Sequence, residues 1–328
     1  MNSWRDQLRY DVLPALLNSG NEAIIYFVSR DLLDEKASPA DFIRQLPESQ
    51  KITKKQRPDG AWKKPGKNTT VYPPNYYLLV ETFKNFRMLV KRYQFTRDHP
   101  SVQKAAEVLL SFQTEDGDIR GFLGSQYATY YTGEILSLLI KAGYEDDPRV
   151  ESGMRWLLSM RQDDGGWTIP ILTHRYDKET THRLTSQYAG PVEPDRTRPF
   201  SHNWTDMVLR AFAAHPGYRK SPEAKAAGNL LKSSFFQPDN YSSYRAARYW
   251  TRFAFWWPNL LTALDSLYWL GFTRDDPDIG KGLQWFFNNQ QPDGLWKLES
   301  DKEIKAKDAE ERTWLGLEIC RVLKRYGS

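Results

Sequence analysis

The chain has 328 residues, of which 40% are hydrophobic, 27% charged and 14% aromatic, a composition typical of a globular protein rather than a disordered one. A formal net charge of +5, scattered along the chain, permits an anionic ligand but argues against a nucleic-acid partner. With one cysteine, no apolar leader and no run of about 18 apolar residues, we expect a cytoplasmic protein without an internal disulfide, a signal peptide or a transmembrane segment.

Helices are the regular elements that the sequence predicts, beginning with two in residues 3–35 that are separated at Asn18–Asn21. The next helix starts at Ser38-Pro39, where serine caps the helix and proline takes a first position whose N–H has no helical partner in any case. Similar starts, with Asp, His or Ser before proline, recur along the chain at Pro100, Pro148, Pro222 and Pro277.

Each of these helices runs into a copy of one short motif, Q-x-x-D-G-x-W. The glycine can take the left-handed conformation that ends a helix, so we interpret the motif as a structural brace between repeats. The Asp residues of the copies are 57, 48, 75 and 54 positions apart. The three good copies and two weaker ones are Gln56–Trp62, Arg161–Trp167 and Gln290–Trp296, then Gln113–Gly117 and Phe236–Tyr241.

A loop and a second, more apolar helix follow each copy, so the repeating unit is helix, motif turn, loop, helix. No segment shows the alternation of a strand, and the sequence therefore predicts an all-α fold. One helix pair cannot bury its own apolar face, so the units must stack on one another. The second helices are expected at 74–93, 127–142, 202–215, 258–271 and 309–326.

The repeated motif resembles the QW motif of squalene–hopene and oxidosqualene cyclases, whose wider relatives include the protein prenyltransferase β subunits. The resemblance covers about residues 38–328. It implies a single α/α toroid, a double ring of about five or six helical hairpins, whose second helices form the inner ring around a cavity. We therefore expect one domain over 1–328, with N-terminal helices in 1–37 and QW-like repeats in 38–328.

Two long insertions, 168–201 and 241–257, follow consecutive motif copies. Long loops in a compact domain are usually functional or disordered, and insertions in repeat proteins gather on one face. We expect the two insertions to be neighbours that form a lid or one wall of a site. A mobile surface excursion is the alternative.

The first insertion ends at a polar helix start that contains His202 and Asn203. A histidine with asparagine, tyrosine and arginine available nearby suits acid–base chemistry, whereas a capping or packing role explains the same residue equally simply. Asp206 is a possible proton donor if its environment keeps it protonated. These three, with Tyr249 of the second insertion, are the candidate catalytic residues.

If the second insertion is helical, Arg245, Arg248 and Arg252 share one face beside an aromatic stripe that includes Tyr249. Arginine with aromatics suits a ligand with an anionic head and an apolar body, although packing of an aromatic-rich segment is an equal alternative. Further candidates for substrate binding come from this insertion and from the starts of the other second helices: Tyr76, Tyr127, Tyr130, Tyr131, Trp204, Trp256, Trp257 and Arg312.

The known catalytic motifs of the resembled families are absent from the sequence. There is no D-x-D-D acid motif, and the similar letters at Asp146-Asp147 and Asp275-Asp276 are interpreted as helix caps. The prenyltransferase zinc set needs an Asp/Cys pair at a helix start, but Cys320 is late in the last helix. We therefore expect no metal ion and no cofactor.

Three functions remain open. The preferred one is an enzyme, a cyclase or transferase, that holds an isoprenoid or similar apolar small molecule in an aromatic cavity. The second is a carbohydrate-active enzyme such as a lyase of acidic polysaccharides, because some α/α-toroid lyases use His, Asn, Tyr and Arg. The third is a non-catalytic toroid that binds a ligand or a protein. The oligomeric state is not predicted.

Overall fold

The computed structural model describes residues 4–36, 39–66, 74–186, 189–241, 245–253, 256–299, 302–303, 305 and 308–327. Within these ranges the regular structure is helical, and the only β-structure is three isolated bridges. The predicted all-α class is confirmed. The cap predicted at Ser38 lies outside the described residues.

The chain divides into two compact units, which are described separately. Unit 1 combines Met1–Leu46 with Leu231–Ser328, and unit 2 is Pro47–Leu230. One boundary lies between α3 (Asp41–Arg44) and α4 (Pro47–Lys54), and the other lies inside α11 (Pro222–Ser233). The single domain expected over 1–328 stays a prediction.

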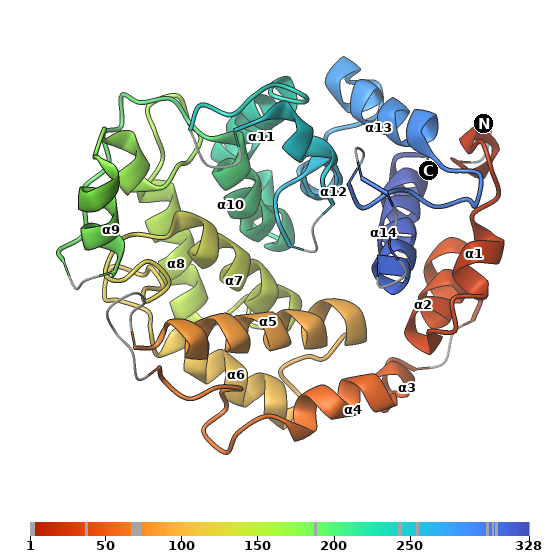
Figure 1. Cartoon of the computed structure of the whole chain (residues 1–328), viewed down its shortest axis with the longest axis horizontal. Helices are drawn as coiled ribbons and strands as arrows, with labels where there is room; N and C mark the ends of the chain where they lie inside the picture. The colour runs from red at the N-terminus through yellow and green to blue at the C-terminus, as the bar shows by residue number, and fades with distance from the viewer. Residues whose placement is uncertain are drawn as a thin grey trace. The chain divides into compact units, whose positions relative to one another are not determined.

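Unit 2 has two layers of helices (Figure 1). The first layer contains α5 (Tyr76–Tyr93), α7 (Thr129–Lys141) and α10 (His202–Ala214), and α7 packs between the other two. The second layer contains α6 (Pro100–Leu110), which packs on α5, and α8 (Pro148–Ser159), which packs on α7. The remaining helices of this unit are α4, the 3-10 helices Pro170–Thr173 and Tyr218–Lys220, and α9 (Lys178–Ser186).

The helices α7 and α10 form the buried centre of unit 2. Every side chain from Thr129 to Ile140 and from His202 to Ala213 is buried. Gly133 permits their close approach, because a Cβ at this position would lie 2.7 Å from the Cα of Val208. The second helices predicted at 74–93, 127–142 and 202–215 are confirmed.

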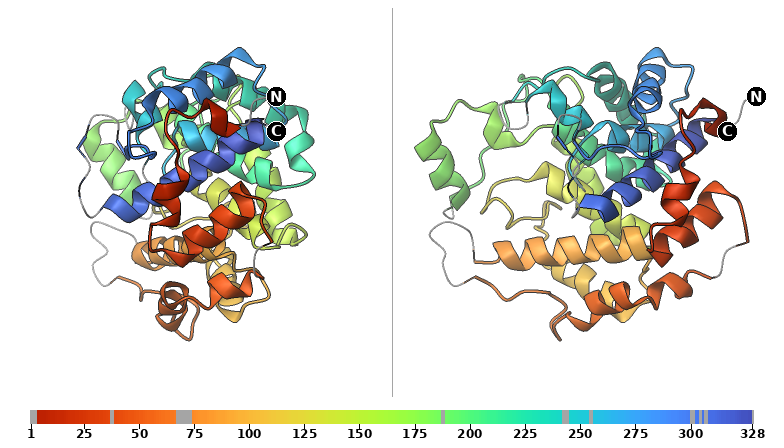
Figure 2. Two further views of the ribbon diagram at one scale, coloured as in Figure 1. Left: turned by 90° about the vertical axis from the view of Figure 1, so that its right-hand side faces the viewer. Right: turned by 45° about the vertical axis from the view of Figure 1, so that its right-hand side comes forward.

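Unit 1 joins the beginning of the chain to its end. The early helices pack against α14 (Ala309–Gly327), as Figures 1 and 2 show. Arg321 of α14 donates from Nε to Asp31 Oδ2 at 2.8 Å and lies 4.3 Å from the centre of the Phe27 ring. The other helices of the unit are the 3-10 helices Trp4–Gln7 and Ala247–Thr251, α1 (Leu13–Leu17), α2 (Glu22–Phe27), the π-helix Val28–Leu32, α3, α12 (Leu260–Trp269) and α13 (Pro277–Asn289).

The Q-x-x-D-G-x-W copies act as braces, as predicted. Each complete copy uses its indole N–H to bind a carbonyl of the preceding helix: Trp62 to Ile52 at 2.8 Å, Trp167 to Leu157 at 2.6 Å and Trp296 to Phe286 at 2.7 Å. In three copies, the side-chain amide of the glutamine that begins the motif donates to two backbone carbonyls. One carbonyl belongs to the glycine of the same copy and the other to a more distant segment: Gln56 to Gly60 and Ser101, Gln113 to Gly117 and Arg149, and Gln290 to Gly294 and Tyr10. In the last copy, the N-terminal segment therefore stands where a following repeat would be.

The motif position needs glycine because of its backbone conformation and because other atoms lie close to it. A substitution at Gly294 tests both requirements. Gly294 has φ +83°, and a Cβ there would lie 2.6 Å from the carbonyl oxygen of Asp11. Gly294→Ala is expected to lower the free energy of unfolding by more than about 2 kcal/mol, measured by urea denaturation, because strain and collision add. The control Gly271→Ala has φ +80° but open space, and should lose only about 1 kcal/mol. Equal losses of unfolding free energy in the two variants would contradict the close approach of Gly294 to Asp11.

The helix starts at Pro100, Pro148, Pro222 and Pro277 are confirmed, whereas the helix expected from Pro39 begins at Asp41. The caps at two of the confirmed starts explain the acidic pairs that resemble a D-x-D-D motif. Asp147 accepts from the backbone N–H of Arg149 at 2.8 Å, and Asp276 accepts from that of Asp278 at 3.1 Å. The helix expected to run from Pro39 to the first motif copy is wrong in one respect. It is divided into α3 and α4, because Pro47 has no N–H to continue the first helix.

Candidate functional site

The start of α10 is tied to the neighbouring motif copy. Ser201 caps the helix, its Oγ accepting from the backbone N–H of Trp204 at 3.4 Å. Trp167 accepts from the N–H of Ser201 at 2.9 Å and donates its own N–H to Thr205 Oγ1 at 2.9 Å. The motif thus holds the first turn of α10, which carries His202 and Asn203, in a fixed place.

His202 and Asn203 are buried, with exposed fractions of 5% and 2%. Burial lowers the pKa of His202 to about 3, because the imidazolium ion loses its hydration. At neutral pH the ring is therefore an uncharged imidazole, which can accept a proton and cannot serve as a resting acid.

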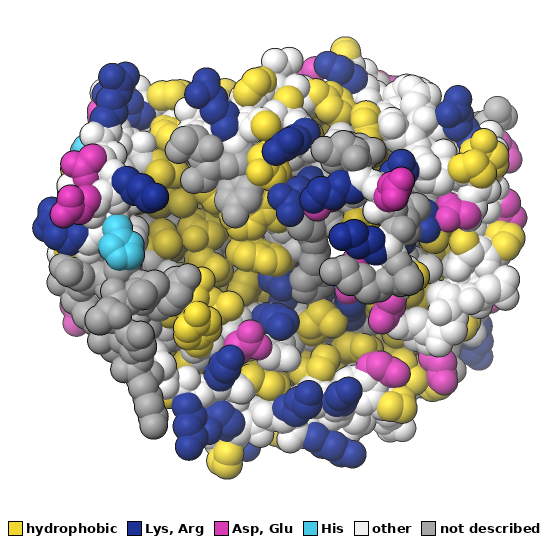
Figure 3. Space-filling model, in the orientation of Figure 1, with side chains coloured by type: hydrophobic (Ala, Val, Ile, Leu, Met, Phe, Trp, Pro, Cys, Tyr) yellow, Lys and Arg dark blue, Asp and Glu magenta, His cyan; other side chains and the backbone are white. Residues whose placement is uncertain are grey.

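Next to this turn lies an aromatic cluster, which we define as Phe83, Phe122, Tyr130, Tyr131 and Trp204. Tyr131 stacks on Phe122 with ring centres 3.8 Å apart and lies 5.6 Å from Phe83. Tyr130 lies 4.5 Å from Tyr131 and 4.7 Å from Trp204. The cluster joins α5, α7 and α10, and hydrophobic side chains gather in a hollow over α7 and α10 (Figure 3). Of the predicted substrate-binding residues, it brings together Tyr130, Tyr131 and Trp204.

The insertion 168–201 docks on the residues that precede α7. The Gln126 amide donates to Gly190 O at 2.9 Å and accepts from the N–H of Val192 at 2.9 Å. Tyr127 donates its hydroxyl to Glu193 at 3.0 Å, and burial together with this carboxylate raises its pKa. Rather than a plain loop, the insertion contains a 3-10 helix and α9 (Figure 1). Tyr127, predicted to bind substrate, anchors this insertion through its hydroxyl.

A buried ion-pair cluster follows the aromatic residues along the same three helices. We define it as Arg87 and Lys91 of α5, Glu134 of α7, and Asp206 and Arg210 of α10. Arg210 binds Glu134 Oε2 at 2.9 Å and Asp206 Oδ2 at 2.8 Å, while Lys91 binds Glu134 Oε1 at 3.3 Å. Arg87 lies 4.9 Å from the centre of the Phe83 ring, where the two clusters meet.

The charge states in this cluster follow from the competition between burial and attraction. Burial would raise the pKa of Glu134, but Lys91, Arg210 and Arg87 outweigh it and lower the pKa to about 2. Burial lowers the pKa of Arg87 to about 9, because the attraction of Glu134 only partly compensates for lost hydration. The ion pair with Arg210 stabilises the carboxylate of Asp206, and a carboxylate cannot donate a proton. We therefore do not propose Asp206 as the acid.

Our sequence reasoning missed Arg87, Lys91, Glu134 and Arg210 of this cluster. The sequence does contain a signal for them, because charged residues occur inside otherwise apolar helices. Arg87 and Lys91 are four residues apart and therefore share one helix face, and the same holds for Asp206 and Arg210.

The shared arginine face in the second insertion required an α-helix, and the described part of this insertion does not form one. The described part forms a short 3-10 helix, Ala247–Thr251, with Arg252 in an extended conformation after it. Arg245, Arg248 and Arg252 therefore do not share one face of an α-helix. Arg252 pairs with Glu299 at 3.1 Å, and both Arg248 and Arg252 lie within 6 Å of the centre of the Tyr249 ring, at 5.8 and 5.7 Å.

The remaining predicted residues are distributed over both units. Trp256 and Trp257 are half-buried neighbours with ring centres 5.2 Å apart, and Tyr76 is the half-buried first residue of α5. Arg312 donates to Trp296 O at 3.1 Å and to Asp293 at 2.9 Å, so its guanidinium braces the last motif copy. Roles in substrate binding for these residues, and the expected proximity of the two insertions, stay predictions.

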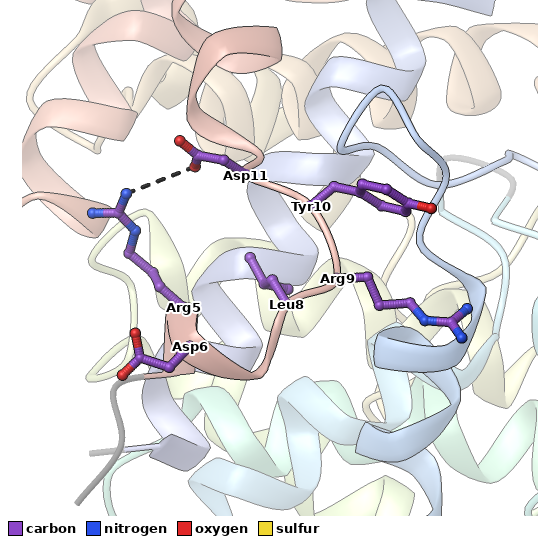
Figure 4. Close-up of a pocket in the computed structure, with 6 residues that line it drawn as sticks. All are labelled: Arg5, Asp6, Leu8, Arg9, Tyr10 and Asp11. Carbon is purple, nitrogen blue, oxygen red and sulfur yellow. Dashed lines mark ion pairs between the residues drawn. The ribbon is translucent and has the colours of Figure 1, made fainter.

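A separate pocket of about 460 Å³ lies in unit 1 against the N-terminal segment (Figure 4). Its lining combines an ion pair between Arg5 and Asp11, 3.7 Å long and more than a third exposed on both sides, with Leu8 and Tyr10. None of the predicted site residues lines it. Exposed, mutually compensating charges make it a poor match to an apolar ligand.

In the described ranges, no three His, Cys, Asp or Glu side chains come together in a way that suits a metal ion. Among the same residues, no helix combines the length and the apolar character needed to cross a bilayer.

Comparison with known proteins gives a family match in this part of the chain. Residues 82–189 match the squalene-hopene cyclase C-terminal domain. The resemblance to terpenoid cyclases is confirmed in this segment. It includes four members of the aromatic cluster, all except Trp204, and the cluster's contacts therefore lie largely within the cyclase-like region.

Solved structures with helical folds are also similar to the chain. A protein from Actinoplanes is 14% identical, with 88% of each chain covered and a TM-score of 0.44. The type II terpene cyclase MstE from Scytonema is 13% identical, with 96% of this chain and 98% of that chain covered and a TM-score of 0.43. Scores of this size bear on neither the substrate nor the site.

Proposed function

We propose that this protein is a terpene cyclase-like enzyme that acts on an isoprenoid or a related apolar substrate. The observation that carries the proposal is the aromatic cluster, which joins the three first-layer helices of unit 2 and, apart from Trp204, lies inside the cyclase-like segment. Aromatic faces attract cations, and a buried group of them suits a substrate that becomes a carbocation during reaction.

His202 supplies a second element of this chemistry. Its ring is held uncharged by burial, and it lies two residues before Trp204 in the same helical turn. A carbocation is a very strong acid at the neighbouring carbon, so even a base of low pKa can take that proton. The C–H electron pair then forms the product alkene, and the proton resides on the imidazole. We propose His202 as this terminating base.

Burial argues against the polysaccharide lyase alternative. A lyase must bring a hydrated polymer to its base, whereas His202 and Asn203 are exposed by only 5% and 2%. In the same turn of α10, Trp204 packs on Tyr130 of α7, with ring centres 4.7 Å apart. We do not propose this function. Non-catalytic ligand binding is the third alternative, and the experiment below would reveal it as a shift in Tm without conversion of the polyprene.

The test is to incubate the purified protein with linear polyprenes, such as squalene and geranylgeranyl compounds, and to look for cyclised products by mass spectrometry. Trp204→Leu is expected to lower turnover by about tenfold, since a desolvated cation–π contact contributes up to about 2 kcal/mol. Trp269→Leu is the matched control, because Trp269 is 45% exposed. Failure of every polyprene to be converted, with no shift in Tm, would refute the proposal.

A further inference from the structure

The buried ion-pair cluster and the aromatic cluster form two successive levels of the same three helices. In α5, Phe83 precedes Arg87, and in α7, Tyr131 precedes Glu134. The pairs Phe83–Tyr131 and Lys91–Glu134 show that α5 and α7 run in parallel, so the aromatic residues of both helices precede their charged residues. The same order holds in α10, where Trp204 and then Arg210 make the contacts to α7.

Of the five residues that define the ion-pair cluster, three are cations and two are anions. Glu134 has an exposed fraction of 0% and forms ion pairs with Lys91 and Arg210. The positive charges of Arg87 and Lys141 also stabilise its carboxylate and lower its pKa. Asp206 adds one carboxylate, which pairs with Arg210. Burying an excess charge is costly, and an anion bound at the cluster would offset that cost.

The cluster is accessible from one side. The side chain of Lys91 is 30% exposed, and Lys141 at the end of α7 is exposed. Arg87 has an exposed fraction of only 3%, and Glu134, Asp206 and Arg210 are also buried. A ligand group that reaches Lys91 thus meets positive charge first. Arg87, at the junction with Phe83, places a cation directly beside the aromatic level.

We propose that Arg87 and Lys91 bind the oxyanion head group of an isoprenoid ligand, a phosphate or a carboxylate, while its hydrocarbon tail contacts the aromatic cluster. The tail contact rests on the proposed function, whereas the anion site does not. Arginine binds phosphate and carboxylate through two N–H groups at once, and lysine adds a point charge. The ligand is therefore amphiphilic, which distinguishes it from a pure hydrocarbon such as squalene.

Calorimetry tests the proposal with three probes: geranylgeranyl diphosphate, geranylgeraniol and inorganic diphosphate. The wild type is expected to bind the prenyl diphosphate at least tenfold more tightly than the alcohol. Arg87→Met and Lys91→Met should remove most of this difference and leave the alcohol affinity unchanged. Arg155→Met is the matched control, because its side chain is 65% exposed and pairs with Glu151.

The outcomes separate the two proposals. Equal affinity of the wild type for prenyl diphosphate and alcohol would overturn the anion site and leave the proposed function intact. Binding of inorganic diphosphate that depends on Arg87, without binding of either isoprenoid, would support the anion site and refute the proposed function. The Tm of ligand-free Arg87→Met provides a structural readout. It should not fall, whereas a fall in Tm with unchanged diphosphate affinity would show that Arg87 serves only the fold.

Discussion

Glu134→Gln is expected to lower the free energy of unfolding by about 3–5 kcal/mol, because it removes the carboxylate that the buried cations share. Glutamine has nearly the same shape, so the loss reports charge rather than packing. The carboxylate accepts from Lys91 at 3.3 Å and from Arg210 at 2.9 Å, and its exposed fraction is 0%. Urea denaturation at pH 7 measures the effect.

Glu107→Gln is the matched control, since Glu107 binds Arg149 at 2.8 Å but its side chain is 62% exposed. Surface ion pairs contribute little, so this change should cost less than about 1 kcal/mol. The folded-state pKa of Glu134 is about 2, against 4.5 in the unfolded chain. Its contribution is therefore complete above pH 4.5 and is lost as the pH falls toward 2. A loss for Glu134→Gln no larger than that of Glu107→Gln would refute the buried cluster.

His202→Gln is expected to reduce turnover of an isoprenoid substrate by about 10²–10⁴-fold, the range typical of a lost general base. Because glutamine keeps a polar side chain of similar reach, substrate affinity should change little. Product analysis provides a second readout: a missing base favours products in which water, rather than loss of a proton, quenches the cation. Unchanged turnover and unchanged products would refute His202 as the base and would show that it only packs in the fold.

The same variant tests the uncharged state of the ring. The folded-state pKa of His202 is about 3, against 6.5 in the unfolded chain, so the unfolded chain binds the proton first on acidification. The free energy of unfolding is thus unaffected by this group above pH 6.5 and falls between pH 6.5 and 3. At pH 5 the wild type should have lost about 2 kcal/mol relative to His202→Gln, compared with pH 7.5. A parallel pH dependence of the two proteins would contradict the burial of the ring.

Prediction from the sequence succeeded where structure depends on nearby residues. The motif tryptophans bind carbonyls ten residues earlier, and the prolines at helix starts follow caps such as Asp147 and Asp276. A shared face for Arg245, Arg248 and Arg252 was expected only if their segment was an α-helix, and the segment instead contains the 3-10 helix Ala247–Thr251. Short aromatic segments adopt several conformations, and their tertiary contacts select one.

The candidate site was predicted in part. The first turn of α10 was identified because a polar helix start after a long insertion is visible in the sequence. Tyr130 and Tyr131 were identified because they begin a second helix. Glu134 was not, because one carboxylate in a helical segment is ordinarily solvated, and its burial depends on Lys91 and Arg210 from other helices.

By itself, the sequence determined the all-α class, the alternation of helices and the bracing motif, because these follow from helical periodicity, caps and contacts between residues of one repeat. The tertiary structure alone decided that the N-terminal segment binds Gln290, that Tyr127 anchors an insertion, and that charges from three helices meet beside the aromatic cluster. These are contacts between residues 43 to 280 positions apart. Which distant segments meet depends on how whole apolar faces pack, and no local pattern encodes that choice.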